Sequence, residues 1–220
     1  MNFRLFALVS LVSAVCASGE AHADYVVWND VETGATLSFP DTWKQINNQQ
    51  PDDLITLSIP SSDDENAVCR LRAREDKRFI IYPNANRADV RDLHFTQQFW
   101  DQYTASYDNV NIVRQQDNGG LGRGFSSMLL VSFMAPPTEP AAQRAGVMAV
   151  TNYYDHVYVA ECTSSLLSYR KFNDGFLSFF KSINFKKVYH ELTIGDYRNF
   201  LNEWGTIDVL LPNGISRSVY

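Results

Sequence analysis

Short segments in which apolar and polar residues alternate run through most of the chain after residue 24 and predict β-strands. The clearest covers residues 67–74, where Ala67, Cys69, Leu71 and Ala73 fall on one face and Val68, Arg70, Arg72 and Arg74 on the other. Similar patterns predict strands over 25–28, 35–39, 54–59, 110–114, 125–135, 145–153 and 157–163. Clusters of turn-forming residues predict turns at 33–34, 117–120 and 154–156.

Apolar residues at three- and four-residue spacing predict two helices between these strands. The first carries Phe95, Phe99 and Tyr103, with Asp92 as its N-cap. The second follows Ser168 and directs a stripe of aromatic and aliphatic residues, Phe172, Phe176, Phe179 and Ile183, toward the core. Strands and helices together predict one mixed α and β domain.

A C-terminal extension over 187–220 has a character of its own. A short helical segment over 196–204 precedes two strand-like runs, 206–211 and 215–220, which flank Asn213-Gly214. Asn-Gly between such runs is a strong β-hairpin signal. A lone hairpin is marginally stable, so this one is expected to dock either on its own domain or on a partner chain. The expected division is 1–23, 24–186 and 187–220.

The first 23 residues have the features of a secretory signal peptide. Arg4 supplies a positive start, an apolar stretch follows over 5–17, and Ala21-His22-Ala23 forms an A-x-A cleavage site. A retained anchor is the alternative, but the apolar run is shorter than the roughly 20 residues that span a bilayer. A lipoprotein acylated at Cys16 is a second alternative, against which the bulky Val15 counts. We expect a periplasmic protein.

Composition and cysteine count agree with export. The chain has 25 acidic and 19 basic side chains, a net charge of −6, and this mixed acidic balance disfavours nucleic-acid and anionic-membrane partners. Signal cleavage leaves two cysteines, Cys69 and Cys162, which an exported protein usually pairs, so a disulfide is expected. Two unrelated buried thiols are the alternative.

Motifs for catalysis or metal binding are weak. His94, His156 and His190 are scattered without ligand spacing, so no metal or other cofactor is expected. Ser126 follows Gly124-Phe125 without the second glycine of a nucleophile elbow, and the glycine-rich 119–124 is expected to be a mobile hairpin loop. The acidic Asp63-Asp64-Glu65 is expected to be a solvated loop, with a small-ligand or Ca²⁺ site as the alternative.

Residues at both ends of the central domain resemble the PsbP-like and Mog-type superfamily, which includes DcrB-type envelope proteins. Leu37-Ser38-Phe39-Pro40 followed by Trp43 resembles the family's opening, and 157–164 leading to Tyr169, Phe172, Phe176, Ser182 and Phe185 resembles its closing. The resemblance covers about residues 25–185. It implies an α+β fold, an antiparallel β-sheet with helices packed on its faces (an α/β/α sandwich), and mostly non-catalytic relatives. It carries over no functional residue.

The hypothesis from sequence is therefore a non-catalytic accessory or binding protein that engages another envelope protein, with no nucleic-acid partner and no stable membrane insertion after cleavage. Trp43, Tyr153 and Tyr154 near strand ends, together with Trp204 in the C-terminal extension, are candidates for its interaction surface. The alternative is a periplasmic hydrolase acting on peptide or glycan through a dispersed site.

Overall fold

The computed structural model describes residues 24–48, 50–77, 97–135 and 143–187. The predicted signal peptide and C-terminal extension lie outside the described residues, as do Asp92, Phe95 and Trp204. The described strands and helices are β1 (Tyr25–Asn29), β2 (Ala35–Pro40), β3 (Lys44–Ile46), β4 (Asp53–Ser58), β5 (Val68–Glu75), α2 (Gln97–Tyr103), β6 (Asp108–Leu121), β7 (Gly124–Met134), β8 (Gln143–Tyr153), β9 (His156–Ser165), α3 (Tyr169–Ser182) and β10 (Asn184–Phe185). Among these elements, no helix is both long and apolar enough to cross a membrane.

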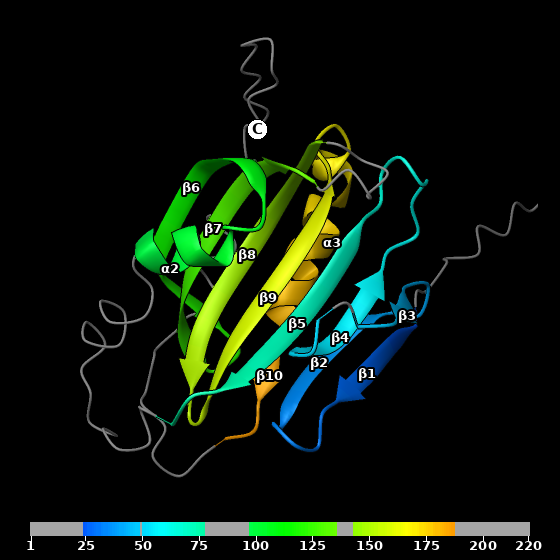
Figure 1. Ribbon diagram of the computed structural model, residues 1–220. Helices are drawn as coiled ribbons and strands as arrows, with labels where there is room; N and C mark the ends of the chain where they lie inside the picture. The colour runs from blue at the N-terminus through cyan, green and yellow to red at the C-terminus, as the bar shows by residue number, and fades with distance from the viewer. Residues whose placement is uncertain (1–23, 49, 78–96, 136–142, 188–220) are drawn as a thin grey trace, which may run out of the picture.

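The strands form two antiparallel sheets, as the α+β prediction requires. Seven strands pair in the order β3-β4-β5-β9-β8-β7-β6, and β1, β2 and β10 make a smaller sheet in the order β1-β2-β10. The larger sheet is strongly twisted, with the smaller one beside its β3–β4 end (Figure 1). β5 and β9 lie next to each other near the middle of the larger sheet.

Helix α3 covers one face of the large sheet (Figure 1). Its stripe of Tyr169, Phe172, Phe176, Phe179 and Phe180 is buried, as the four- and three-residue spacing predicts. These rings join inward side chains of both sheets in one apolar core, which we call the α3-side core. It includes Leu37, Ile55, Leu71, Val147 and Ala160. This core contains most of the buried apolar residues, so it is the main source of stability.

The described residues cover only part of the opposite face of the sheet. Trp100 of the short helix α2 is fully buried against apolar residues of β7, β8 and β9, namely Leu129, Val131, Phe133, Met148, Val150, Val157 and Val159. Its indole Nε1 donates to Ser127 Oγ at 2.8 Å, which satisfies the buried polar atom. In Figure 1, α2 lies over the β6 side of the sheet, and β5 is left uncovered by any described helix.

One turn prediction is wrong. Residues 117–120 belong to β6, where Gly119 and Gly120 pair with Ser126 and Phe125, and so the glycine-rich 119–124 is not a free loop. A register shift between Gln116 and Gly119 accommodates these glycines as a β-bulge, which is a common use of glycine within a strand. The chain instead reverses at Gly122-Arg123, where Gly122 has φ of 60°.

The cysteine pairing is confirmed. Cys69 on β5 and Cys162 on β9 face each other in register and form a disulfide, with their Cα atoms 4.1 Å apart. Both cysteines are fully buried in the α3-side core. The bond therefore joins the two central strands from inside.

Candidate binding cleft

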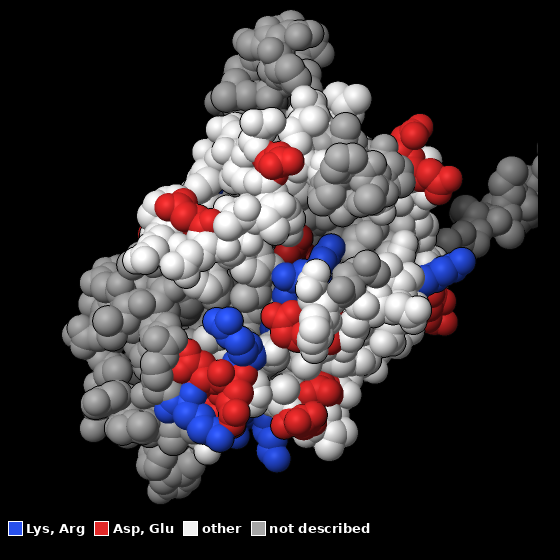
Figure 2. All heavy atoms as spheres, in the orientation of Figure 1, with Lys and Arg blue, Asp and Glu red and all other residues white. Residues whose placement is uncertain are grey.

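A cleft with a volume of about 690 Å³ opens on the face that α2 leaves uncovered. Four arginines line it, Arg70, Arg72 and Arg74 from β5 and Arg144 from β8, against two carboxylates, Asp52 and Glu161. The other lining residues are Gln50, Phe99, Gln102, Tyr103, Ser106, Tyr107, Phe133 and Thr163. Figure 2 shows basic side chains gathered in the hollow at the centre of this face, with acidic ones beside them. We call this site the arginine cleft.

The alternation of β5 explains why three arginines share one face. Arg70, Arg72 and Arg74 alternate with Cys69, Leu71 and Ala73, so the strand buries its apolar side chains under α3 and directs its cations away. Opposite Arg70, β9 places Glu161 on the same face, since the two residues are paired in register. The cleft thus lies on the reverse side of the sheet from the disulfide.

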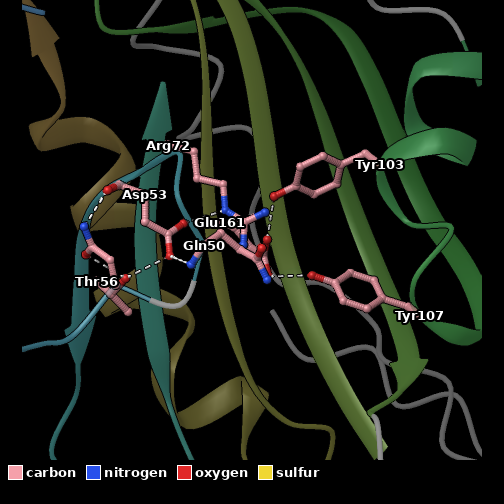
Figure 3. A network of polar contacts seen from close by, with 8 residues as sticks. Gln50, Asp53, Thr56, Arg72, Tyr103, Tyr107 and Glu161 are labelled. Carbon is pink, nitrogen blue, oxygen red and sulfur yellow. Dashed lines mark hydrogen bonds and ion pairs between the residues drawn. The ribbon is translucent and has the colours of Figure 1, made fainter. Parts of the chain in front are cut away.

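Glu161 is the centre of the polar network in the cleft (Figure 3). Its side chain is almost fully buried and accepts hydrogen bonds from Tyr103 Oη at 2.7 Å and Tyr107 Oη at 3.1 Å. A buried carboxylate requires such partners, because its desolvation is costly. The carboxylate therefore holds the end of α2 and the following segment against β9.

Arg72 links the network to the first strands of the sheet. Its Nε donates to Asp53 Oδ1 at 2.8 Å, and Asp53 also accepts from the backbone N–H of Gln50 at 2.9 Å (Figure 3). The Arg72 guanidinium carbon lies 5.7 Å from the centre of the Tyr103 ring, a cation–π distance. These contacts join β4, β5 and α2 and orient the arginine at the cleft.

Charge states in the cleft follow from these contacts. Burial is the largest single effect on the pKa of Arg70 and lowers it, but the combined attraction of Glu161, Tyr107 and Tyr103 exceeds it, so the net shift is upward. The pKa of Arg72 is also raised, against the effect of burial, by Tyr103, Glu161 and Asp53. The pKa values of Tyr103 and Tyr107 are raised, mainly by burial and to a smaller extent by the negative charge of Glu161. At neutral pH the cleft therefore contains charged arginines and neutral tyrosines.

Arg144 forms the floor of the cleft. It is only 3% exposed, and its Nη2 donates to Thr163 Oγ1 at 2.7 Å and to the Asn66 carbonyl at 3.0 Å. These bonds tie β8 to β9 and to the turn before β5. Arg144 thus contributes positive charge from a fixed, buried position, while Arg74 stands exposed at the other end.

The aromatic residues predicted as an interaction surface do not form one patch. Trp43 and Tyr153 are each 8% exposed; Trp43 stacks on Phe179, and Tyr153 stacks on Phe185 at 5.3 Å. Both rings are therefore part of the α3-side core. The prediction that Trp43 and Tyr153 lie at an interaction surface is wrong for these two residues. Tyr154 is 50% exposed in the β8–β9 turn, with φ of 57°, and Trp204 lies outside the described residues.

Other candidate chemistry remains dispersed. His156 Nδ1 lies 2.7 Å from Asp155 Oδ1, but no serine among the described residues forms a hydrogen bond with this histidine. Glu65 of the acidic loop binds Lys171 Nζ at 2.7 Å. Within the part of the chain that the structure describes, no group of three His, Cys, Asp or Glu side chains could hold a metal ion. His94 and His190 lie outside that part.

The cleft residues that were not predicted as a site from the sequence are the arginines of β5. Their alternation with buried residues is visible in the sequence, and it indicates an outward face with three cations in a row. The net charge of −6 concealed them because it averages the whole chain. Their meeting with Glu161, Tyr103 and Tyr107 depends on strand pairing that the sequence does not display.

Comparison with known proteins shows the fold. The chain has 12% identity to the solution structure of cyanobacterial PsbP (CyanoP) from Synechocystis sp. PCC 6803, with a TM-score of 0.53 over 76% of this chain and 96% of that one. LpqN of Mycobacterium tuberculosis, described as involved in cell envelope biogenesis, has 12% identity and a TM-score of 0.45 over 76% and 92%. No family model matches the chain, and no curated protein matches it by sequence. The chain therefore has a PsbP-like fold.

Proposed function

We propose that this protein is an exported, non-catalytic accessory protein that engages another envelope protein by binding an anionic part of it in the arginine cleft. The arginine cleft is the observation that carries the proposal. It has the size of a ligand site and places four cations against two carboxylates on a protein that is acidic as a whole. An arginine presents a planar fork of donors that suits carboxylate and phosphate groups.

The organisation of the cleft favours binding over chemistry. Glu161 accepts hydrogen bonds from the hydroxyls of Tyr103 and Tyr107, and Asp53, which lies beside the cleft, accepts one from Arg72, so these two carboxylates act as internal partners that orient neighbouring groups. The cations they position are ready to receive an anion with little reorganisation. Export is supported by the buried disulfide, which is typical of proteins in oxidising compartments.

Site-specific photocrosslinking in the native cell envelope tests this proposal. A photoreactive residue replaces the exposed Gln102 at the rim of the cleft, and a control replaces Val31, which is 89% exposed in the β1–β2 turn and does not line the cleft. We expect a single envelope-protein adduct from position 102 that is absent at position 31.

Charge-removing variants then show whether the cleft itself is responsible. R74Q should abolish or strongly weaken the adduct at position 102, because it removes an exposed cation of the cleft. R170Q removes an exposed arginine from α3 and should leave the adduct unchanged. An adduct that is insensitive to R74Q, or none at all from position 102, contradicts the proposal.

A further inference from the structure

The arginine row, which we define as Arg70, Arg72 and Arg74, has a regular geometry. The three residues are at alternate positions of one strand, so their Cα atoms repeat at about 6.8 Å and the row spans roughly 13 Å. Among the described residues, Arg70 and Arg74 make no side-chain hydrogen bond or ion pair. Among the described residues, Arg72 donates a hydrogen bond from Nε to Asp53, which occupies one of its five guanidinium donors. The row is therefore a line of cations with unused donor capacity.

A linear arrangement selects against a single small anion. One phosphate or carboxylate can be gripped by cations that converge on it, whereas the ends of this row lie roughly 13 Å apart on a rigid strand. Full use of the row requires a ligand whose negative charges repeat at a similar interval. An extended peptide has that property, because every second side chain points the same way at about 6.8 Å.

The walls of the cleft also suit a peptide. Phe99, Tyr103 and Tyr107 form an aromatic wall on the α2 side, and the exposed amides of Gln50 and Gln102 stand at opposite rims. Aromatic side chains offer apolar surface to the residues between the acidic ones. Amide side chains can both donate to and accept from a peptide backbone. β5 already pairs with β4 and β9, so the ligand lies across the face of the sheet and does not extend it.

We propose that the arginine cleft recognises an extended acidic peptide segment with Asp or Glu at alternate positions, aligned along β5 so that its acidic side chains meet the arginine row. This inference rests on the proposed function, since it names the chemistry of the partner's anionic part. Arg70 and Arg74 contribute the contacts that a ligand gains most directly. Asp53 acts as a positioning residue for Arg72, and Glu161 positions Tyr103 and Tyr107 in the aromatic wall, since both carboxylates are buried and already hydrogen-bonded.

Two peptides of identical composition and charge provide the test. The matched peptide is Glu-Ala-Glu-Ala-Glu-Ala-Ala, and the mismatched peptide is Glu-Ala-Ala-Glu-Ala-Ala-Glu. In an extended chain, the glutamates of the second peptide alternate between opposite sides, so they cannot all face β5. Fluorescence anisotropy with the mature protein should show that the matched peptide binds about tenfold more tightly, which corresponds to one additional charged contact.

Arginine variants locate the binding. R74Q should weaken binding of the matched peptide by about threefold to tenfold, and R70Q should weaken it by about tenfold. R170Q on α3 should leave the affinity unchanged. Because Arg74 is exposed, R74Q should retain the native melting temperature, which separates lost binding from lost folding. Raising the salt concentration should weaken the matched complex.

Failure of this inference is distinguishable from failure of the proposed function. Equal affinity for the two peptides, reduced equally by R74Q, would overturn the alternate-charge inference and leave the proposed function standing. Binding of inorganic phosphate or of phosphatidylglycerol vesicles that requires Arg74, with neither peptide bound, would overturn the peptide as ligand. No binding of either peptide, together with no adduct at position 102, would overturn both.

Discussion

Arg70 and Glu161 lie directly opposite each other on β5 and β9, one step in register from the disulfide between Cys69 and Cys162. Because successive residues of a strand face opposite sides, the disulfide points into the α3-side core while Arg70 and Glu161 point into the arginine cleft. A covalent bond in the core thus fixes the strand register on which the cleft depends.

Loss of the disulfide should destabilise the protein. The bond joins residues separated by 93 positions, so the C69A/C162A double variant is expected to lose about 2–5 kcal/mol of the free energy of unfolding. Urea unfolding of the wild type and of C69A/C162A, both expressed without residues 1–23, measures this loss. Thiol titration of the denatured, unreduced protein without residues 1–23, which has only Cys69 and Cys162, should find no free thiol, and two free thiols would refute the pairing.

Removal of the Glu161 charge should weaken the attachment of α2. E161Q leaves a neutral amide against the hydroxyls of Tyr103 and Tyr107, and we expect a loss of about 1–3 kcal/mol in unfolding free energy. E75Q on the neighbouring strand β5 is the matched control, because Glu75 is exposed and, among the described residues, its side chain pairs with the exposed Lys77. The control should change stability by less than about 0.5 kcal/mol. Equal effects of the two variants would contradict a central role for Glu161.

Replacement of Trp43 should act on folding. Because its ring is buried against α3, W43A is expected to cost about 3–5 kcal/mol in a chemical unfolding experiment. Y154A removes an exposed ring and should cost at most about 0.5 kcal/mol. A stable W43A protein that had lost only partner binding would restore the sequence-based hypothesis of a surface role.

Stability should fall in alkaline solution. Burial raises the pKa of Tyr103, Tyr107, Tyr158 and Tyr169 above the ordinary value near 10, so these residues stay protonated in the folded state after the unfolded chain has ionised. The native state then binds more protons, and stability decreases as pH rises above about 10. Each of these tyrosines lowers the free energy of unfolding by up to about 1.4 kcal/mol for each pH unit in this range.

Urea unfolding between pH 8 and pH 11 measures that slope. Y107F removes one of the titrating groups and should make the decline shallower, whereas Y25F removes an exposed hydroxyl and should leave it unchanged. A pH-independent unfolding free energy over this range would contradict neutral buried tyrosines.

Local periodicity in the sequence determined the elements and their inward faces. The alternation in 67–74 places Cys69 and Leu71 inside, and the spacing of Phe172, Phe176 and Phe179 defines the buried side of α3. These predictions succeed because burial of apolar residues follows the period of each element. The Cys69–Cys162 pairing followed from export and an even cysteine count.

Only the tertiary structure decided which surfaces stay open and which residues meet there. The sequence shows three alternating arginines but not that α2 stops short of β5, nor that β9 places Glu161 opposite Arg70. It shows Trp43 and Tyr153 near strand ends but not the helix and strand that cover them. It shows glycines at 119–120 but not the bulge that keeps them in β6. Each of these features depends on contacts between residues distant along the chain, which local patterns do not encode.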